Sequence, residues 1–206
     1  MKIIYKAIYF LINKVINALS KVVVPIYFRL NGICFSEGLD CKGLPYLSIQ
    51  GQFNIGKNFK NNNRLSSNPI GGTYRSLFVV RKNGVLIIGE NTGLSGVSIV
   101  CHSKITIGDN VKIGGNTCIY DTDFHSLDMK TRRDPFHDKQ GVKSAEIFIS
   151  DDVFIGAHSL ILKGVNIGKG SIVGAGSVVT TSIPGNEVWA GNPAKFIRKI
   201  SDQYDD

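Results

Sequence analysis

The chain has 206 residues, a formal net charge of +8, 23 glycines and an aromatic share of 9%. This length favours one domain with a terminal extension, and many glycines with few aromatic residues suit a β-solenoid better than a helical bundle. The positive charge favours an anionic partner, which is a phosphorylated cofactor, a membrane surface or nucleic acid. Nucleic acid has the least support, because no compact run of Lys and Arg alternates with aromatic residues.

Cysteine spacing gives a second constraint. Cys34, Cys41, Cys101 and Cys118 form no CxxC pair, and no signal-peptide cleavage pattern accompanies them. We therefore expect free, mostly buried thiols and a cytoplasmic protein, with association at the inner face of the membrane as an alternative.

Residues 1–30 predict an amphipathic helix, because lysines and asparagines recur at helical spacing on one side and aliphatic residues fill the other. Lys6 and Lys14 leave an uncharged run well below the ~20 residues that a membrane span requires, so we expect no transmembrane helix. Two placements stay open. The helix packs on the end of the solenoid or on a partner subunit, or it lies on a membrane surface.

Residues 31–87 are irregular. Gln50-Gly51 and Ile55-Gly56 suggest early coils, whereas the asparagines from Asn61 to Asn63 and Asn68-Pro69 indicate a loop. We expect early coils interrupted by that loop.

Residues 88–183 repeat in blocks of six. The clearest blocks begin at Ile149, Ile155, Ile161, Ile167 and Val173. An amphipathic helix needs a 3.6-residue period and a half-buried strand a period of two, so neither explains the pattern. A six-residue unit cannot bury an apolar face alone, and stacked units share one core. The prediction is a parallel β-solenoid with its aliphatic residues in inward ladders.

A long interruption separates two parts of this repeat. Residues 120–146 are charged and aperiodic, and they contain His125 and His137. A loop of this length inside a compact repeat is usually functional. After the last block, Pro184-Gly185 leads the chain out of the solenoid into a C-terminal extension, residues 184–206, where Pro193 predicts the start of a short helix.

The hexads resemble those of the hexapeptide-repeat family, whose fold is a left-handed parallel β-helix. Together with the His125 loop and the closing segment Ala190–Lys195, residues 88–200 are similar to galactoside and maltose acetyltransferases and to capsule or lipopolysaccharide O-acetyltransferases. The resemblance implies an all-β fold, acetyl-CoA as co-substrate, a saccharide hydroxyl as acceptor, a homotrimer and no catalytic metal.

The resemblance also implies roles for individual residues. His125 occupies the position of the family's general base, and a neutral imidazole suits that chemistry. Its orienting group stays open between Asp121, Asp123 and a backbone carbonyl. The backbone N–H of Ala157 matches the donor for the oxyanion.

Ligand contacts follow in the same way. Ser95 stands where a galactoside relative has an acceptor-binding Asn, and Asp121 and Asp123 are further candidates for the acceptor. Positions that match coenzyme A contacts are Phe154, Ala157, Ala175, Thr180, Lys195 and Arg198. Thr181 departs from the family pattern, which often has Lys there. Arg132 and Arg133 are alternative contacts for an anionic ligand.

Three other functions remain as alternatives. A γ-type carbonic anhydrase needs three converging histidines, and His102, His125, His137 and His158 show no closely spaced pair. A solenoid without catalysis would bind a membrane or an assembly partner through its first helix. N-acetylation of an amino sugar nucleotide is the alternative among enzymes, although residues 1–87 contain no Gly-rich phosphate loop.

Overall fold

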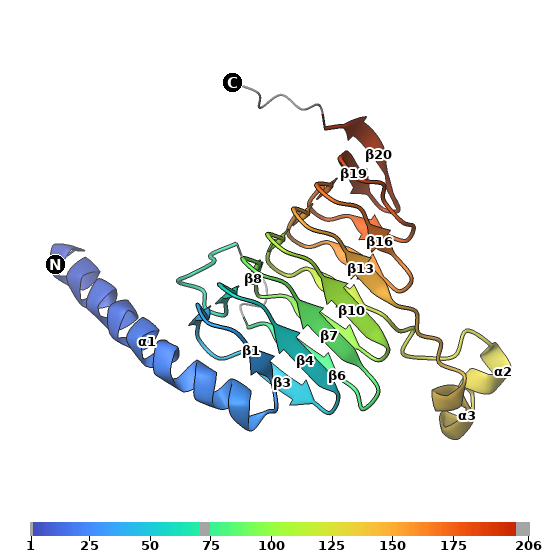
Figure 1. The fold of residues 1–206 in the computed structure, drawn as a ribbon, viewed down its shortest axis with the longest axis horizontal. Helices are drawn as coiled ribbons and strands as arrows, with labels where there is room; N and C mark the ends of the chain where they lie inside the picture. The colour runs from blue at the N-terminus through green and yellow to red at the C-terminus, as the bar shows by residue number, and fades with distance from the viewer. Residues whose placement is uncertain (1, 71–74, 201–206) are drawn as a thin grey trace.

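A three-sided solenoid follows one long N-terminal helix in the computed structural model, which describes residues 2–70 and 75–200 (Figure 1). Over these residues the strands stack in three sheets, here called A, B and C, which the chain visits in turn. Sheet A contains β1 (Cys34–Phe35), β4 (Gln52–Ile55), β7 (Val85–Ile88), β10 (Lys104–Ile107), β13 (Ile147–Ile149) and β16 (Asn166–Ile167). Sheet C contains β3 (Tyr46–Ile49), β6 (Leu77–Val80), β9 (Ser98–Cys101), β12 (Cys118–Tyr120), β15 (Leu160–Leu162) and β18 (Val178–Val179).

Sheet B is extended at its C-terminal end by a hairpin. Its strands are β2 (Asp40–Lys42), β5 (Lys60–Asn62), β8 (Gly93–Ser95), β11 (Lys112–Ile113), β14 (Phe154–Ile155), β17 (Ile172–Val173), β19 (Glu187–Gly191) and β20 (Ala194–Lys199). All neighbouring strands in the three sheets are parallel except β19 and β20. The predicted parallel solenoid is confirmed.

The hexad ladders form the core as predicted. Paired strands place Ile149 beside Ile167, Ile155 beside Val173 and Ile161 beside Val179. These side chains are at most 1% exposed. Burying each aliphatic side chain contributes about 1.5–3 kcal/mol, so the ladders are the main source of stability.

Residues 31–87 are more regular than predicted. They already contain β1 to β6 and the start of β7, and β4 pairs with β7 in the same parallel arrangement as the later coils. Aromatic and polar residues hide the repeat, because Phe53, Phe59, Phe78 and Asn61 occupy buried positions that Ile or Val fill later. The expected loop is present at residues 63–70 and 75–76, between β5 and β6, and residues 71–74 lie outside the described residues.

The predicted C-terminal helix is wrong. Residues 187–199 form the antiparallel hairpin of β19 and β20, and Pro193 lies in its turn. This hairpin gives β17 a hydrogen-bonding partner, and so it covers a sheet edge that would otherwise be open. Trp189 and Phe196 meet edge to face there, and Trp189 packs against the end of the core.

The predicted N-terminal helix is confirmed as α1 (Lys2–Leu30), which crosses the first coil at the opposite end (Figure 1). Val24 and Phe28 enter the core. By length and composition, Ile4–Leu30 is long and apolar enough to cross a membrane, with a hydropathy of 1.5. The spacing of the lysines therefore does not exclude a span by itself, and the absence of a transmembrane helix stays a prediction.

Candidate active site

The residues between β12 and β13 form an excursion that projects from the corner where sheet C meets sheet A (Figure 1). Its two ends are held together at a narrow neck. Thr122 and Ser144 form an antiparallel bridge, and the amide of Ala145 donates to the carbonyl of Asp121 at 2.9 Å. The excursion thus leaves and re-enters the solenoid at one point.

Two short helices shape the tip of the excursion, α2 (Met129–Arg132) and α3 (Pro135–Gln140). Asp134 caps α3, because its side chain accepts hydrogen bonds from the amides of Phe136 and His137, and Pro135 follows at the first helical position. These local signals direct Asp138, on α3, back toward the start of the excursion.

His125 and Asp138 form the most developed polar pair in the excursion. His125 Nδ1 lies 2.6 Å from Asp138 Oδ2, and the amide of Ser126 donates to Asp138 Oδ1 at 2.7 Å. The carboxylate is largely buried, whereas the imidazole is 69% exposed in the single chain. The hydrogen bond from His125, followed by that from Ser126, lowers the pKa of the Asp138 carboxyl. An ionised Asp138 keeps the proton on Nδ1, which leaves Nε2 free to accept a proton.

Phe124 precedes His125 in an unusual conformation. Its φ is 64°, in the left-handed region that bulky residues rarely adopt. The ring packs edge to face against Tyr120, at 5.2 Å between centroids, and against His102, at 6.3 Å. Such backbone strain concentrates at functional sites, and here it lies directly beside the candidate base.

The residue that orients His125 is therefore neither of the two aspartates predicted from the sequence. Asp121 is fully buried, and its two carboxylate oxygens accept from the amides of His102 and Ser103 at 2.7 and 2.8 Å. It holds a corner of the solenoid, so its predicted role in acceptor binding is also wrong. Asp123 pairs with Lys163 at 3.3 Å instead of contacting His125. Its contact with an acceptor stays a prediction.

The outer face of sheet B carries a second group of predicted residues. Ser95 and Phe154 line a groove of about 350 Å³ together with Lys60, Asn62, Gly93, Leu94, Lys112, Ile113 and Gly114. Asn62 Nδ2 donates to Ser95 Oγ at 3.1 Å. Gly93 leaves the surface of the sheet open, because a side chain there would meet only Lys112, whereas Gly114 is required by the close backbone of Ala157 in the next coil.

Lys195 and Arg198 lie on this same outer face, at its C-terminal end. The hairpin pairs Ala190 with Lys195 and Val188 with Arg198, with a bulge between these pairs. Without the bulge, residues three apart would point to opposite sides of the strand. The bulge therefore gives the two cations a common side.

Ala157 and Ala175 occupy the corner that follows sheet B. Within the described part of the chain, the amide of Ala157 donates to no acceptor, whereas its neighbours Gly156 and His158 donate to Val173 and Gly115. A free amide is required of an oxyanion donor. The amides of Gly115 and Ala175, at the same place in adjacent coils, are also free, so the choice of Ala157 still rests on the resemblance.

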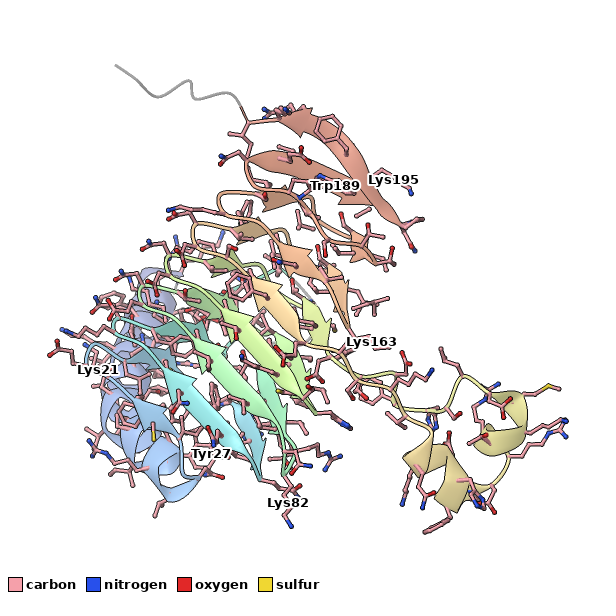
Figure 2. All side chains as sticks on the ribbon, turned by 45° about the vertical axis from the view of Figure 1, so that its right-hand side comes forward. Lys21, Tyr27, Lys82, Lys163, Trp189 and Lys195 are labelled. Carbon is pink, nitrogen blue, oxygen red and sulfur yellow. The ribbon has the colours of Figure 1, made fainter. Side chains whose placement is uncertain are left out.

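The predicted residues thus fall into two groups on different edges of the prism. His125, Asp123 and Thr180 belong to the corner between sheets C and A, whereas the Ser95 and Phe154 groove, Ala157, Ala175 and the two cations belong to sheet B and its following corner. Figure 2 shows Lys163 at the base of the excursion and Lys195 far from it on β20. Sheet C separates the groups, so one chain does not bring them together.

The other histidines show different surroundings. His137 is exposed and pairs with Asp134 at 3.0 Å, and His158 is an exposed corner residue with a φ of 62°. Burial lowers the pKa of His102. Among the residues with described positions, no group of three or more His, Cys, Asp or Glu is arranged to hold a metal ion.

The three parallel sheets and the six-residue repeat give this chain the left-handed β-helix fold of hexapeptide-repeat proteins. Residues 147–181 match the family model described as the hexapeptide repeat of succinyl-transferase. The resemblance to hexapeptide-repeat acyltransferases is confirmed by its relatives. Over 108 residues the chain is 42% identical to the galactoside O-acetyltransferase of Escherichia coli K12, covering 52% of this chain and 50% of the relative.

Two solved structures extend the comparison. One is a hexapeptide-repeat acetyltransferase of Vibrio cholerae complexed with acetyl coenzyme A, with 37% identity, a TM-score of 0.52, and coverage of 57% of this chain and 61% of that one. The other is a polySia-specific acetyltransferase, with 26% identity, a TM-score of 0.63, and coverage of 82% and 66%. The chain spans about half the length of the curated relatives that it matches.

Proposed function

We propose that this protein is an acetyl-CoA-dependent O-acetyltransferase that modifies a saccharide hydroxyl, in the biosynthesis of a capsule, exopolysaccharide or lipopolysaccharide. The observation that carries the proposal is the hydrogen-bonded pair of His125 and Asp138 on an excursion from the solenoid. The relatives support the class of reaction, since they include a galactoside O-acetyltransferase and an acetyltransferase complexed with acetyl coenzyme A. Free cysteines fit a cytoplasmic location.

The geometry of the pair suits general-base catalysis. Asp138 holds the proton on Nδ1 of His125, so Nε2 removes the proton of the acceptor hydroxyl as its oxygen attacks the thioester carbonyl. The C–O bond forms, and the oxyanion accepts a hydrogen bond from the amide of Ala157. When the C–S bond breaks, the coenzyme A thiolate takes the proton from Nε2, and His125 returns to its neutral form.

The distribution of the site residues supports a homotrimer. Of the six predicted coenzyme A contacts, all but Thr180 lie on sheet B and the corner after it, whereas His125 lies with Thr180 at the corner between sheets C and A. Packing of prisms side by side brings the excursion of one protomer to the groove of the next, and cyclic symmetry repeats the site at each interface.

A free-thiol assay with acetyl-CoA tests the reaction over a panel of sugars, sugar nucleotides and lipid-linked oligosaccharides. We expect thiol release with at least one acceptor, and a loss of about 10²- to 10⁴-fold in turnover for His125→Ala. His137→Ala is the matched control, because this second histidine of the excursion also pairs with an aspartate but is expected to keep full activity.

The product distinguishes the two enzyme hypotheses. An O-acetyl ester is released by mild alkali, whereas an N-acetyl amide is retained. An alkali-stable product would show N-acetylation, and the absence of acetyl-CoA binding and turnover with every acceptor would refute the proposed class of reaction.

A further inference from the structure

Helix α1 turns its polar residues toward the solenoid. Arg64 donates to the side chains of Asn13 and Asn17 at 2.7 and 3.2 Å, and Ser20 Oγ accepts from the amide of Gly43 at 3.2 Å. Among the described side chains of α1, the fully buried apolar ones are Val24 and Phe28 in its last turns. A surface helix of a soluble protein normally has the opposite orientation, with its apolar side inward.

The opposite side of α1 is a continuous apolar stripe. Its members follow one another at three- or four-residue spacing, and each is at least half exposed: Ile8, Ile12, Val15, Leu19, Val22, Ile26 and Leu30. A contiguous apolar patch that runs along most of an exposed helix marks an interaction surface on a soluble protein. The stripe therefore needs a partner that the single chain does not supply.

The charges of α1 indicate the chemistry of that partner. The helix contains Lys2, Lys6, Lys14, Lys21 and Arg29, and its sequence has no Asp or Glu. Tyr5 and Tyr9 stack at 6.2 Å near its start, and tyrosine favours the interface between membrane and water. An anionic lipid surface complements these charges. A second copy of the same helix would instead bring like charges together.

We propose that α1 lies in the plane of an anionic membrane surface, with the stripe inserted at the boundary between headgroups and acyl chains. Its contacts with Arg64, Gly43 and the core hold the helix across the end of the solenoid. A membrane-spanning helix would have to break them, so the helix lies on the membrane. The solenoid then projects away from the lipid, with β19 and β20 at its far end (Figure 1). This inference does not depend on the proposed function.

Co-sedimentation of the full chain with vesicles tests the proposal. We expect binding to vesicles of phosphatidylglycerol and phosphatidylcholine and much weaker binding to phosphatidylcholine alone. Leu19→Asn with Val22→Asn should weaken binding by about tenfold or more, because two apolar side chains leave the lipid. Phe10→Asn is the matched control, since Phe10 is exposed but lies on the other side of the helix from the stripe.

A second pair of variants tests the role of charge. Lys14→Gln with Lys21→Gln should weaken binding to the anionic vesicles by about tenfold and leave binding to phosphatidylcholine unchanged. Circular dichroism confirms that each variant keeps its fold.

Three results would overturn the proposal. The first is equal binding, or no binding, to both kinds of vesicle. The second is a smaller oligomer by light scattering for Leu19→Asn with Val22→Asn, which would show that the stripe joins copies of the chain. The third is retention in cell membranes after carbonate extraction, which would show a spanning helix.

Discussion

At the scale of single residues, the proposed base His125 depends on Asp138 for its tautomer. The Asp138 carboxylate accepts hydrogen bonds from His125 Nδ1 and from the amide of Ser126, and so it fixes both the tautomer and the start of the excursion. We predict that Asp138→Asn lowers kcat by about 10²-fold or more, because an amide can donate to Nδ1 and stabilise the wrong tautomer. The KM for acetyl-CoA should stay near its original value in steady-state measurements.

The same residue makes a pH-dependent contribution to stability. The folded-state pKa of Asp138 is lowered, so this contribution is present above the ordinary carboxyl pKa of about 3.9 and is lost as the pH falls through the lowered folded value. Urea unfolding below that ordinary pKa should therefore show a smaller difference between wild type and Asp138→Asn than unfolding at neutral pH. An unchanged difference would contradict the role of the carboxylate.

The cysteines differ in reactivity for a physical reason. Burial raises the pKa of the Cys41 and Cys101 thiols to about 12, whereas Cys34 is exposed. The thiolate is the reactive form, so we predict that a disulfide reagent labels Cys34 rapidly in the native protein and leaves Cys41 and Cys101 unlabelled. Mass spectrometry of labelled peptides checks this. Cys34→Ser should remove the fast phase and reduce the background of the thiol assay.

Sequence reasoning found His125 but missed Asp138, because their contact joins residues that a folded loop brings together. The signal that could have found it is Asp134-Pro135, which predicts the start of a helix with Asp138 in its first turn. Proximity in sequence favoured Asp121 and Asp123 instead. Asp121 is buried in a corner of the solenoid and Asp123 pairs with Lys163, so neither carboxylate contacts His125.

At the scale of elements, the C-terminal hairpin has the clearest functional consequence. The bulge in β20 brings Lys195 and Arg198 to one side of the strand. We predict that Lys195→Gln with Arg198→Gln raises the KM for acetyl-CoA by about tenfold or more and leaves kcat unchanged, because charge-assisted bonds to phosphate are lost. Lys199→Gln is the control on the same strand, since Lys199 follows Arg198 and points to the other side.

The elements were predictable where one residue type dominates the core. Ile and Val at every sixth position predicted the coils from residue 88 onward, and the same ladders are buried in the structure. The early coils place Phe and Asn inside, so their periodicity is hidden. The C-terminal segment was misread because Pro193 fits the start of a helix as well as a hairpin turn, and only pairing with β17 favours the hairpin.

At the scale of the whole molecule, the two groups of predicted site residues lie apart on one chain, so the proposed reaction requires a site shared between protomers. We predict that two inactive variants complement each other when they are unfolded, mixed and refolded. One carries His125→Ala, and the other carries Lys195→Glu with Arg198→Glu. With random mixing, roughly a quarter of the sites combine an intact base from one protomer with an intact groove from its neighbour.

The measurement is thiol release by the mixture at low acetyl-CoA, compared with each variant refolded alone. Recovery of roughly a quarter of wild-type activity supports a site shared between protomers. If the mixture stays as inactive as the separate variants while light scattering shows a trimer, each chain would have to hold a complete site.

The neck of the excursion has a consequence for how such a protein can change. Because Thr122 and Ser144 close the neck, we expect the segments beyond it that flank His125 and Asp138 to tolerate changes in sequence and length without displacement of the strands of the solenoid. A new acceptor preference can therefore arise from changes in those flanking segments alone, while the groove proposed to bind the thioester stays unchanged.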